Sequence, residues 1–390
     1  MNKIGILTYY YKSKNIGGLL QSYALTSILN KYNFQAEQIC FDYDYRDLQA
    51  IRVKTTLRYE KLNPKDIIKR LFFYKRKIKS FFSKKPPVSL MSVQNEKFDS
   101  FKESIPHSAY SYNNSNIIDS NKVYQTFLLG SDQIWNTELL PLSAYYGEFT
   151  TPDRRVVSYG ASSNVKQFSP ASERLFIKKL QRVDAISVRE KTLKEYIERI
   201  TCKKVQLVLD PTFLLSPQEW LKIANQKVVP QKPYIFCYFL GDKCAWQRQV
   251  VQSYADKYGY EIVHLPYIMR TIRSADKYLK GQERYDVGPR EFIALIANAK
   301  YIFTDSFHGL AFSINFGKNF YVFNRNDEIG PNSMNARITD TLNLFNLSDR
   351  RIMDNNTILN NTQIDFTNAH KILEQEKQKS INWLLNVLKE

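Results

Sequence analysis

The chain has 390 residues, of which 43% are hydrophobic and 24% charged, a composition typical of a globular protein with room for two domains. Its formal net charge of +18 favours anionic partners. No zinc-finger spacing and no RNP-type aromatic motif accompanies this charge, so we expect no nucleic-acid partner. We find no signal-peptide pattern and no apolar run of about eighteen residues, which predicts a cytoplasmic protein. The four cysteines form no C-x-x-C pair, and we expect no metal site.

Strands and helices alternate through the first half of the chain. Strands are predicted at 3–8, 35–41, 126–129, 155–159, 185–188 and 205–209, and helices at 19–31, 171–182 and 190–200. This alternation predicts a mainly parallel sheet with helices on both faces. We assign residues 1–212 to an N-terminal Rossmann-like domain.

A basic insertion, residues 46–95, interrupts this domain. Between Arg52 and Lys85, thirteen Lys or Arg residues stand against only Glu60 and Asp66. The predicted helix at 64–83 has a phenylalanine-rich face opposite a basic face, a pattern found in helices that lie in a membrane interface. It predicts peripheral contact with the anionic inner face of the membrane. The alternative is that the phenylalanines pack on the domain and the lysines face water.

A second alternating series follows a break at Asp210-Pro211. Strands are predicted at 234–240, 261–265, 301–304 and 320–323, and helices at 243–258, 289–298, 309–316 and 335–345. Ser216 and Pro217 are typical N-cap and first-turn residues of a further helix. We predict a second Rossmann-like domain over 213–365 and a C-terminal helix over 366–390 that packs back on the first domain. The expected fold is thus α/β, with two doubly wound domains facing each other across a cleft.

Polar side chains follow the apolar stretch 301–304. Asp305, Ser306 and His308 stand at this corner, and Gly309 comes next. Open α/β sheets bind ligands at the carboxyl ends of their strands, where backbone N–H groups and the helix dipole converge. Considered alone, a histidine here is more often a cap of the strand end, so the other motifs decide its interpretation.

Two further segments place candidate ligand-binding residues at strand ends. Gly17 and Gly18, after Asn15, open a helix and let an anion or a hydroxyl-rich group approach the backbone, although a tight turn explains them equally well. Asp132 is suited to orient sugar hydroxyls or to cap a turn, and Trp135 to stack on a sugar face.

Arg189 follows the predicted strand 185–188. A guanidinium at the end of a buried strand is costly unless it meets an anion or a carboxylate. Glu190 is the adjacent carboxylate, but neighbouring residues of a strand point to opposite faces. These residues therefore favour an anion near Arg189.

Together these segments resemble the polysaccharide pyruvyl transferase family over nearly the whole chain. The matching stretches are 15–24, 129–136, 158–162, 186–190, 209–212, 287–292, 304–309, 335–338 and 347–350. The resemblance implies a glycosyltransferase-B-like (GT-B-like) pair of Rossmann-like domains. It also implies transfer of pyruvate from phosphoenolpyruvate to sugar hydroxyls as a ketal, in capsule, exopolysaccharide or cell-wall glycan biosynthesis. Phosphoenolpyruvate is then the co-substrate, a sugar or lipid-linked glycan the acceptor, and no other cofactor is implied.

Roles for individual residues follow from the resemblance and from the corners described above. We expect His308 to act as acid or base and Asp132 to orient or deprotonate the acceptor. The expected donor-binding residues are Arg189, Ser306, Gly309 and Arg337, and the expected acceptor-binding residues are Asn15, Gly17, Gly18 and Trp135.

One departure from the family pattern bears on the donor. Characterised pyruvyl transferases commonly have arginine two residues before the histidine, in an R-x-H-G motif, and this chain has Ser306 there. By motif, Arg337 or Arg290 is the nearest replacement. Ser306 favours two alternatives: a GT-B-like enzyme that uses a nucleotide sugar, and a non-catalytic sugar-binding member of the family.

Overall fold

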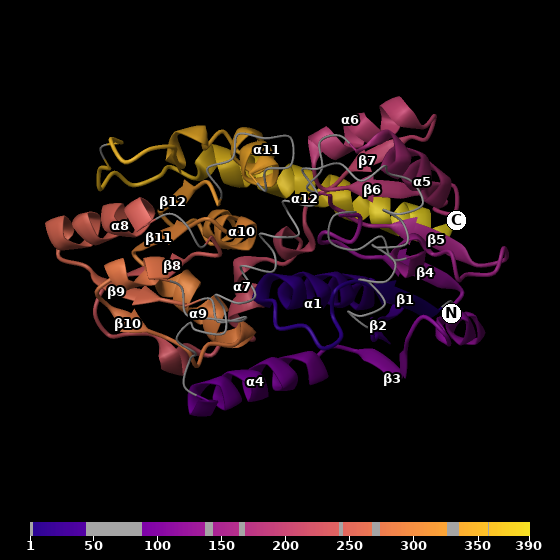
Figure 1. The fold of residues 1–390 in the computed structure, drawn as a ribbon, viewed down its shortest axis with the longest axis horizontal. Coiled ribbons are helices and arrows are strands. Elements are labelled where there is room, and N and C mark those ends of the chain that lie inside the picture. Colours follow the sequence, from indigo (N-terminus) through magenta and orange to yellow (C-terminus); the bar gives the residue numbers. More distant parts are fainter. Residues whose placement is uncertain are drawn as a thin grey trace, which may run out of the picture.

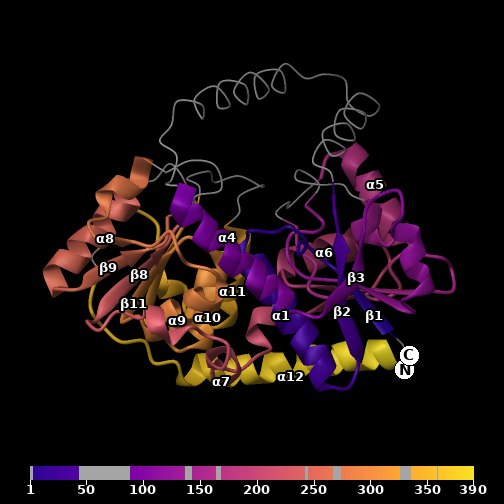
Figure 2. The ribbon, with the colours of Figure 1, turned by 90° about the horizontal axis from the view of Figure 1, so that it is seen from below.

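The computed structural model describes residues 3–43, 88–136, 143–163, 168–241, 245–266, 274–325, 335–357 and 359–390. Two parallel sheets form the centres of two α/β domains that lie side by side (Figures 1 and 2). The predicted basic helix at 64–83 lies outside the described residues. Among the residues that are described, no helix is long and apolar enough to cross a membrane.

The first sheet has five parallel strands in the order β3-β2-β1-β4-β5. Their bounds are β1 Lys3–Leu7, β2 Gln35–Phe41, β3 His107–Tyr112, β4 Thr126–Leu129 and β5 Arg155–Ser158. Two further parallel strands, β6 Ile186–Val188 and β7 Val205–Leu207, continue beyond β5 through bridges from Val157 to Ala185 and from Ala161 to Val188.

Helices cover both faces of this sheet. α1 (Ile16–Lys31) shares one hydrophobic core with Leu128 of β4. α5 (Pro170–Leu180) and α6 (Lys191–Ile200) share another core with the alternate residues Phe127 and Leu129. Successive side chains of a strand point to opposite faces, so α1 lies on one face and α5 and α6 on the other.

The second sheet has six parallel strands in the order β10-β9-β8-β11-β12-β13. Their bounds are β8 Tyr234–Tyr238, β9 Glu261–His264, β10 Gln282–Glu283, β11 Tyr301–Thr304, β12 Phe320–Phe323 and β13 Arg351–Ile352. Its helices are α8 Ala245–Tyr258, α9 Pro289–Asn298, α10 Phe307–Asn315 and α11 Ala336–Leu344. In both sheets the first strand is internal and the fourth lies beside it. A topological switch point therefore lies between β1 and β4 and between β8 and β11, where doubly wound folds bind ligands.

Long helices connect the domains. α4 (Val88–Glu103), which includes the end of the predicted insertion, donates from Gln94 Nε2 to the Val287 carbonyl at 3.1 Å. α12 (Thr367–Lys389) runs along both domains (Figure 2). Its His370 contacts the Ile314 carbonyl of the second domain at 2.9 Å, and its Ser380 Oγ accepts from Leu209 N at 2.9 Å. The domain limits at 212 and 365 stay predictions.

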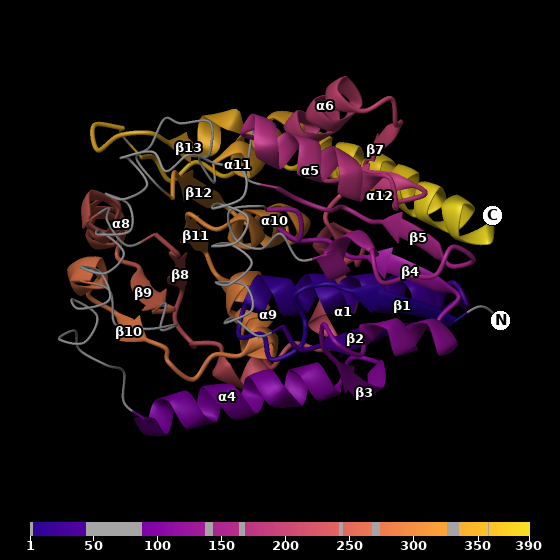
Figure 3. The ribbon, with the colours of Figure 1, turned by 45° about the vertical axis from the view of Figure 1, so that its right-hand side comes forward.

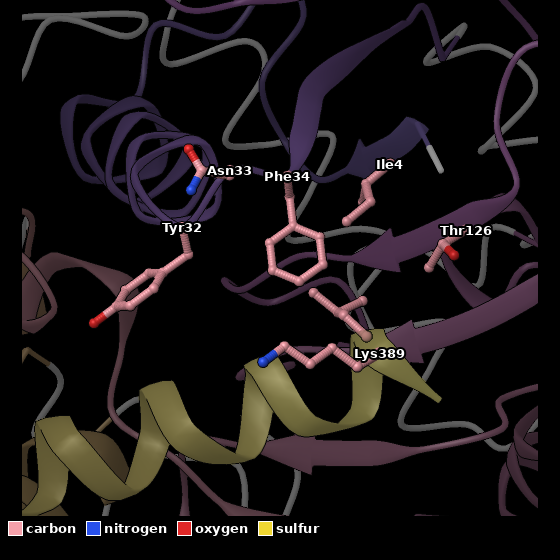
Figure 4. Close-up of a pocket in the computed structure, with 7 residues that line it drawn as sticks. Ile4, Tyr32, Asn33, Phe34, Thr126 and Lys389 are labelled. Carbon is pink, nitrogen blue, oxygen red and sulfur yellow. The ribbon is translucent and has the colours of Figure 1, made fainter. Parts of the chain in front are cut away.

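A pocket of about 320 Å³ lies where the end of α12 meets the first sheet (Figure 4). Its lining residues are Ile4, Tyr32, Asn33, Phe34, Thr126, Leu388 and Lys389. Ile4 and Thr126 stand at the amino ends of β1 and β4. The pocket is therefore at the opposite edge of the sheet from the switch point.

Trp220, on α7 (Pro217–Leu221), joins the two domains from within. The predicted cap is confirmed: Ser216 accepts from Glu219 N, and Glu219 returns a hydrogen bond to Ser216 N. Trp220 is fully buried, and its Nε1 donates to the Thr212 carbonyl at 3.1 Å. Its ring packs on Tyr23 of α1 and on Phe312 of α10.

We predict that Trp220→Ala lowers the free energy of unfolding by about 3–5 kcal/mol, because it leaves a large cavity between α1 and α10. Trp220→Phe keeps an aromatic ring in the site and removes less volume. Its lost hydrogen bond should lower the free energy of unfolding by about 1 kcal/mol, in addition to the effect of the smaller cavity. Urea unfolding measures both, with the half-exposed Leu221→Ala as the control. Equal losses for the alanine and phenylalanine variants would contradict this packing role.

Candidate functional site

The two switch points meet at the domain interface, where α1 and α10 lie between the sheets (Figure 3). A Cβ atom built on Gly17 of α1 would lie only 1.9 Å from Nδ1 of His308 on α10. The α1 backbone and the imidazole are therefore in direct contact. The candidate site lies around this contact, at the carboxyl ends of β4, β6 and β11.

The first turn of α1 forms one wall of the site. Asn15 is the N-cap of α1, and its side chain accepts from Gly18 N at 3.3 Å. Gly18 lies beside Asp132, since a Cβ atom there would be 3.5 Å from Asp132 Oδ2. Asp132 itself has a φ of 72°, which lets it leave β4 and turn toward α1. The structure thus places the predicted residues Asn15, Gly17, Gly18 and Asp132 together.

Arg189 holds three carboxylates around one buried guanidinium. Its Nη2 lies 3.2 Å from Asp132 Oδ1 and its Nε 3.3 Å from Glu190 Oε1. Its Nη1 bonds Asp210 Oδ2 and lies 3.3 Å from Ser131 Oγ. Burial disfavours the guanidinium charge, but the carboxylates outweigh it and raise the pKa of Arg189. The sequence favoured an anion near Arg189; in the structure its guanidinium is bonded to carboxyl groups of the protein.

The pKa values of the three carboxyl groups around Arg189 shift in different directions. Burial opposes ionisation of Asp132 and Asp210, but Arg189 and His308 outweigh it, and the pKa of each carboxyl is lowered. Glu190 differs because burial outweighs Arg189 and Arg337, so its pKa is raised. Of the three carboxyls, Glu190 keeps its proton to the highest pH.

His308 is a neutral base at pH 7. Its side chain is buried, and Nε2 has no hydrogen-bond partner in the described part of the chain. Burial lowers the pKa of His308 to about 4, although Asp210 and Asp132 oppose this shift. A neutral imidazole can accept a proton as a general base, but it is too weak an acid to protonate a weakly basic substrate. Of the two roles expected for His308, the structure favours the base.

Arg337 is a cation with little compensation. It lies in the first turn of α11, is 6% exposed, and its Nε bonds to no described residue. Burial, together with the nearby charges of Arg189 and Arg325, lowers the pKa of Arg337 to about 9. Phe307 lies beneath both cations, with its ring centre 4.7 Å from Arg189 and 5.5 Å from Arg337. An anion bound here would restore the balance of charge.

Ser306 and Gly309 shape the corner that presents His308. Ser306 is the N-cap of α10, and its hydroxyl accepts from Gly309 N at 3.4 Å. A Cβ atom on Gly309 would lie 2.4 Å from Thr304 Oγ1, so the helix can pack this close to β11 only with glycine there. Asp305 accepts from Leu240 N at 2.6 Å and thereby ties β11 to the end of β8.

Two residues considered from the sequence lie elsewhere. Trp135 is fully buried, stacks on Tyr146 at 5.8 Å, and donates from Nε1 to the Tyr145 carbonyl. Its ring has no exposed face on which a sugar could stack, so the expected acceptor role does not fit the structure. Arg290 donates to the Ile223 carbonyl and lies over Phe101, so it faces α4.

Asp210 and Ser131 are parts of the site that the sequence analysis missed. We interpreted Asp210 only as a break before Pro211. Its signal was available, because it directly follows the predicted strand 205–209, and Asp132 likewise stands in the polar turn after 126–129. Carboxyl ends of neighbouring parallel strands lie at one edge of a sheet, where their polar residues meet.

Solved structures with the same two-domain arrangement show which fold the chain adopts. UDP-GlcNAc 2-epimerase from Methanocaldococcus jannaschii matches with a TM-score of 0.54 and 13% identity, covering 99% of this chain and 99% of that one. UDP-GlcNAc 2-epimerase from Neisseria meningitidis bound to UDP-GlcNAc matches with a TM-score of 0.50 and 11% identity, covering 100% of both chains. At this identity the likeness concerns the fold, and the predicted GT-B-like pair of Rossmann-like domains is confirmed.

The family follows from the sequence. The model of the polysaccharide pyruvyl transferase family matches residues 15–327. The chain therefore belongs to the polysaccharide pyruvyl transferase family, and it is a transferase of polysaccharide biosynthesis. A search of curated proteins finds no match.

We predict opposite effects for alanine at the two neighbouring glycines. Gly17→Ala places a methyl group against the buried imidazole, so His308 must move, at a cost of about 1–3 kcal/mol in stability. Gly18→Ala meets only ordinary contacts of 3.5 Å and should gain about 0.5–1 kcal/mol from higher helix propensity.

Thermal unfolding of the two variants measures this difference. His308→Ala removes the clashing ring, so in that background Gly17→Ala should lose most of its penalty. An equal penalty in both backgrounds would show that α1 and His308 are not in contact.

Proposed function

We propose that this protein transfers pyruvate from phosphoenolpyruvate to two hydroxyls of a sugar, forming a cyclic ketal. The observation that carries the proposal is the pairing of Arg337 with His308 at the domain interface. Each is buried and has a nitrogen without a partner among the described residues. A buried polar atom left unpaired costs about 1–3 kcal/mol. A ligand with an anionic group for Arg337 and a hydroxyl for His308 satisfies both, and phosphoenolpyruvate with a sugar supplies these groups.

In the proposed reaction, the methylene carbon of phosphoenolpyruvate gains a proton and the neighbouring carbon becomes electrophilic. A sugar hydroxyl attacks that carbon and passes its proton to Nε2 of His308. Phosphate then leaves, and a second hydroxyl closes the ketal ring. A neutral imidazole suits this base role, and Asp132, fixed by Arg189 beside the first turn of α1, orients the acceptor.

The two arginines have different tasks in this proposal. Arg189 is already bound to Asp132, Glu190 and Asp210, so it contributes fixed positive charge and holds the carboxylates in place. Arg337 makes the direct contact with the phosphate or carboxylate of the donor. Because Arg337 belongs to the second domain and Arg189 to the first, both act on the donor only when the domains are together.

The remaining expectations from the sequence belong to the same proposal. The acceptor is a sugar or a lipid-linked glycan, phosphoenolpyruvate is the co-substrate, and no other cofactor takes part. The protein works in the cytoplasm, and residues 64–83 hold it at the inner face of the membrane. This last point is supported by the basic and phenylalanine-rich pattern of those residues.

We predict that His308→Ala lowers turnover at least about a hundredfold and leaves phosphoenolpyruvate binding largely intact, because general acid–base groups contribute about 10²–10⁴-fold. Activity of the wild type should fall as the pH drops toward about 4, where His308 becomes protonated. The assay is phosphate release that depends on a candidate glycan, with a pyruvyl mass gained by the product.

His107→Ala is the control, since His107 lies on β3, outside the site. Full turnover in His308→Ala would overturn the base role. A wild type that releases no phosphate with any acceptor but binds UDP-GlcNAc would support the nucleotide-sugar alternative suggested by Ser306.

For the donor contact, we predict that Arg337→Gln weakens phosphoenolpyruvate binding about 10–100-fold, the loss expected for a charge-assisted hydrogen bond of about 1.5–3 kcal/mol. Arg337→Lys should recover only part of this affinity, because it keeps the charge and loses the planar fork. Titration followed by thermal shift measures the affinities, with Arg290→Gln as the control on α9. Unchanged affinity in Arg337→Gln would exclude Arg337 as the anion contact.

A further inference from the structure

We propose that Glu190 is a further catalytic residue, whose Oε2 gives a proton to the methylene carbon of phosphoenolpyruvate and later takes the proton of the second sugar hydroxyl. This inference rests on the proposed function and deepens it. With His308 as the base, the proposed reaction still lacks an acid. Protonation of the methylene carbon needs a group that holds a proton at the working pH.

The position of Glu190 frees its carboxyl for this task. Glu190 is the N-cap residue of α6, but its side chain makes no capping hydrogen bond. Asp340 of α11, in the other domain, lies beside the helix N-terminus instead, close enough for the backbone N–H groups of Lys191 and Thr192 to favour its carboxylate form. A residue at this position usually satisfies the helix N-terminus. Here the carboxyl beside the helix N-terminus comes from across the domain interface, and that of Glu190 turns elsewhere.

The carboxyl of Glu190 is held by one oxygen and open at the other. Oε1 accepts from Ser162 Oγ at 2.5 Å and from Arg189 Nε at 3.3 Å. Glu190 is 1% exposed, and within the described ranges Oε2 has no hydrogen-bond partner. Such an atom is stabilised by a proton of its own or by a ligand hydroxyl. Both belong to the proposed reaction.

Glu190 also lies near the donor contact. Glu190 and Arg337 are close enough for each charge to affect the pKa of the other, although they come from different domains. The donor bound by Arg337 is therefore a neighbour of the Glu190 carboxyl.

The charges around Glu190 explain why it holds a proton. Arg189 precedes Glu190 in the chain, and Arg337 and Asp340 lie nearby on α11. Three further titratable groups interact with Arg189: Asp132, Asp210 and His308. The two arginines and the Ser162 hydroxyl favour the carboxylate, but burial outweighs them and the pKa of Glu190 is raised. His308, by contrast, is neutral and ready to accept.

The steps balance without any other reactant. The Oε2 proton goes to the methylene carbon, whose double-bond electrons form the new C–H bond, and the first hydroxyl oxygen bonds the neighbouring carbon. The proton of that hydroxyl moves to His308. The C–O bond to phosphate then breaks, and phosphate leaves with the electron pair and the His308 proton. The second hydroxyl bonds the same carbon and its proton returns to Oε2, so both residues are restored.

Two variants test this role. Glu190→Gln keeps the shape and the acceptor oxygen for Arg189 and Ser162 but holds no acidic proton, so turnover should fall at least about a hundredfold with phosphoenolpyruvate affinity largely unchanged. The wild type should lose activity as the pH rises through the raised pKa of Glu190. Ser162→Ala removes a hydrogen bond that favours the carboxylate, so this loss should move to higher pH. Ser120→Ala is the control, because Ser120 is also buried but bonds the Ile117 carbonyl.

The outcomes separate this inference from the proposed function. If the wild type releases phosphate and Glu190→Gln keeps its turnover, the catalytic role is wrong and the proposed function stands. If Glu190→Gln unfolds, the pH profile of Ser162→Ala decides, since a purely structural Glu190 predicts no shift. If the wild type releases no phosphate from phosphoenolpyruvate, the proposed function fails first, and this inference fails with it.

Discussion

The buried guanidinium of Arg189 is the interaction on which the site depends. It bonds carboxylates that follow three strands, with Asp132 after β4, Glu190 after β6 and Asp210 after β7. Removing one partner of such a buried set leaves an uncompensated charge, at a cost of about 3–5 kcal/mol. Because Asp210 also starts the crossing into the second domain, this cluster fixes the strand ends and the path of the chain together.

The electrostatics of the site follow from that arrangement. Arg189 is bonded to the nearby carboxyl groups, which leaves Arg337 with little compensation, and burial keeps His308 neutral. The two domains touch where Gly17 of α1 contacts His308 of α10, and this contact leaves no space for a side chain at position 17. An anion with nearby hydroxyls completes the charge balance and the hydrogen bonds that the protein leaves open. These properties are the basis of the proposal that the site takes a small anionic donor and a sugar acceptor.

The sequence was informative where a signal is local. Strands such as 301–304 are short apolar stretches followed by polar corners, and the structure places Asp132, Arg189, His308 and Arg337 together as their motifs suggested. Long-range facts were out of reach. Trp135 follows a polar turn in the sequence, yet tertiary packing buries it against Tyr146. The carboxylates around Arg189 come from separate strands, and their meeting depends on sheet order. The helix α4 and the strands β3, β10 and β13 were not predicted, and β10 and β13 have only two residues each.

Position 306, where the family commonly has arginine, is serine in this chain, and a buried arginine stands on α11 instead. Ser306 is 1% exposed and caps α10, so position 306 contributes to the shape of the corner. The buried cation beside His308 comes instead from Arg337, on a different helix. One turn along the same helix, Asp340 lies beside the N-terminus of α6 in the first domain. Residues three apart share a helix face, so the proposed donor contact and the carboxyl beside α6 lie on one side of α11. The proposed donor contact is therefore built where α11 of the second domain meets the start of α6 of the first.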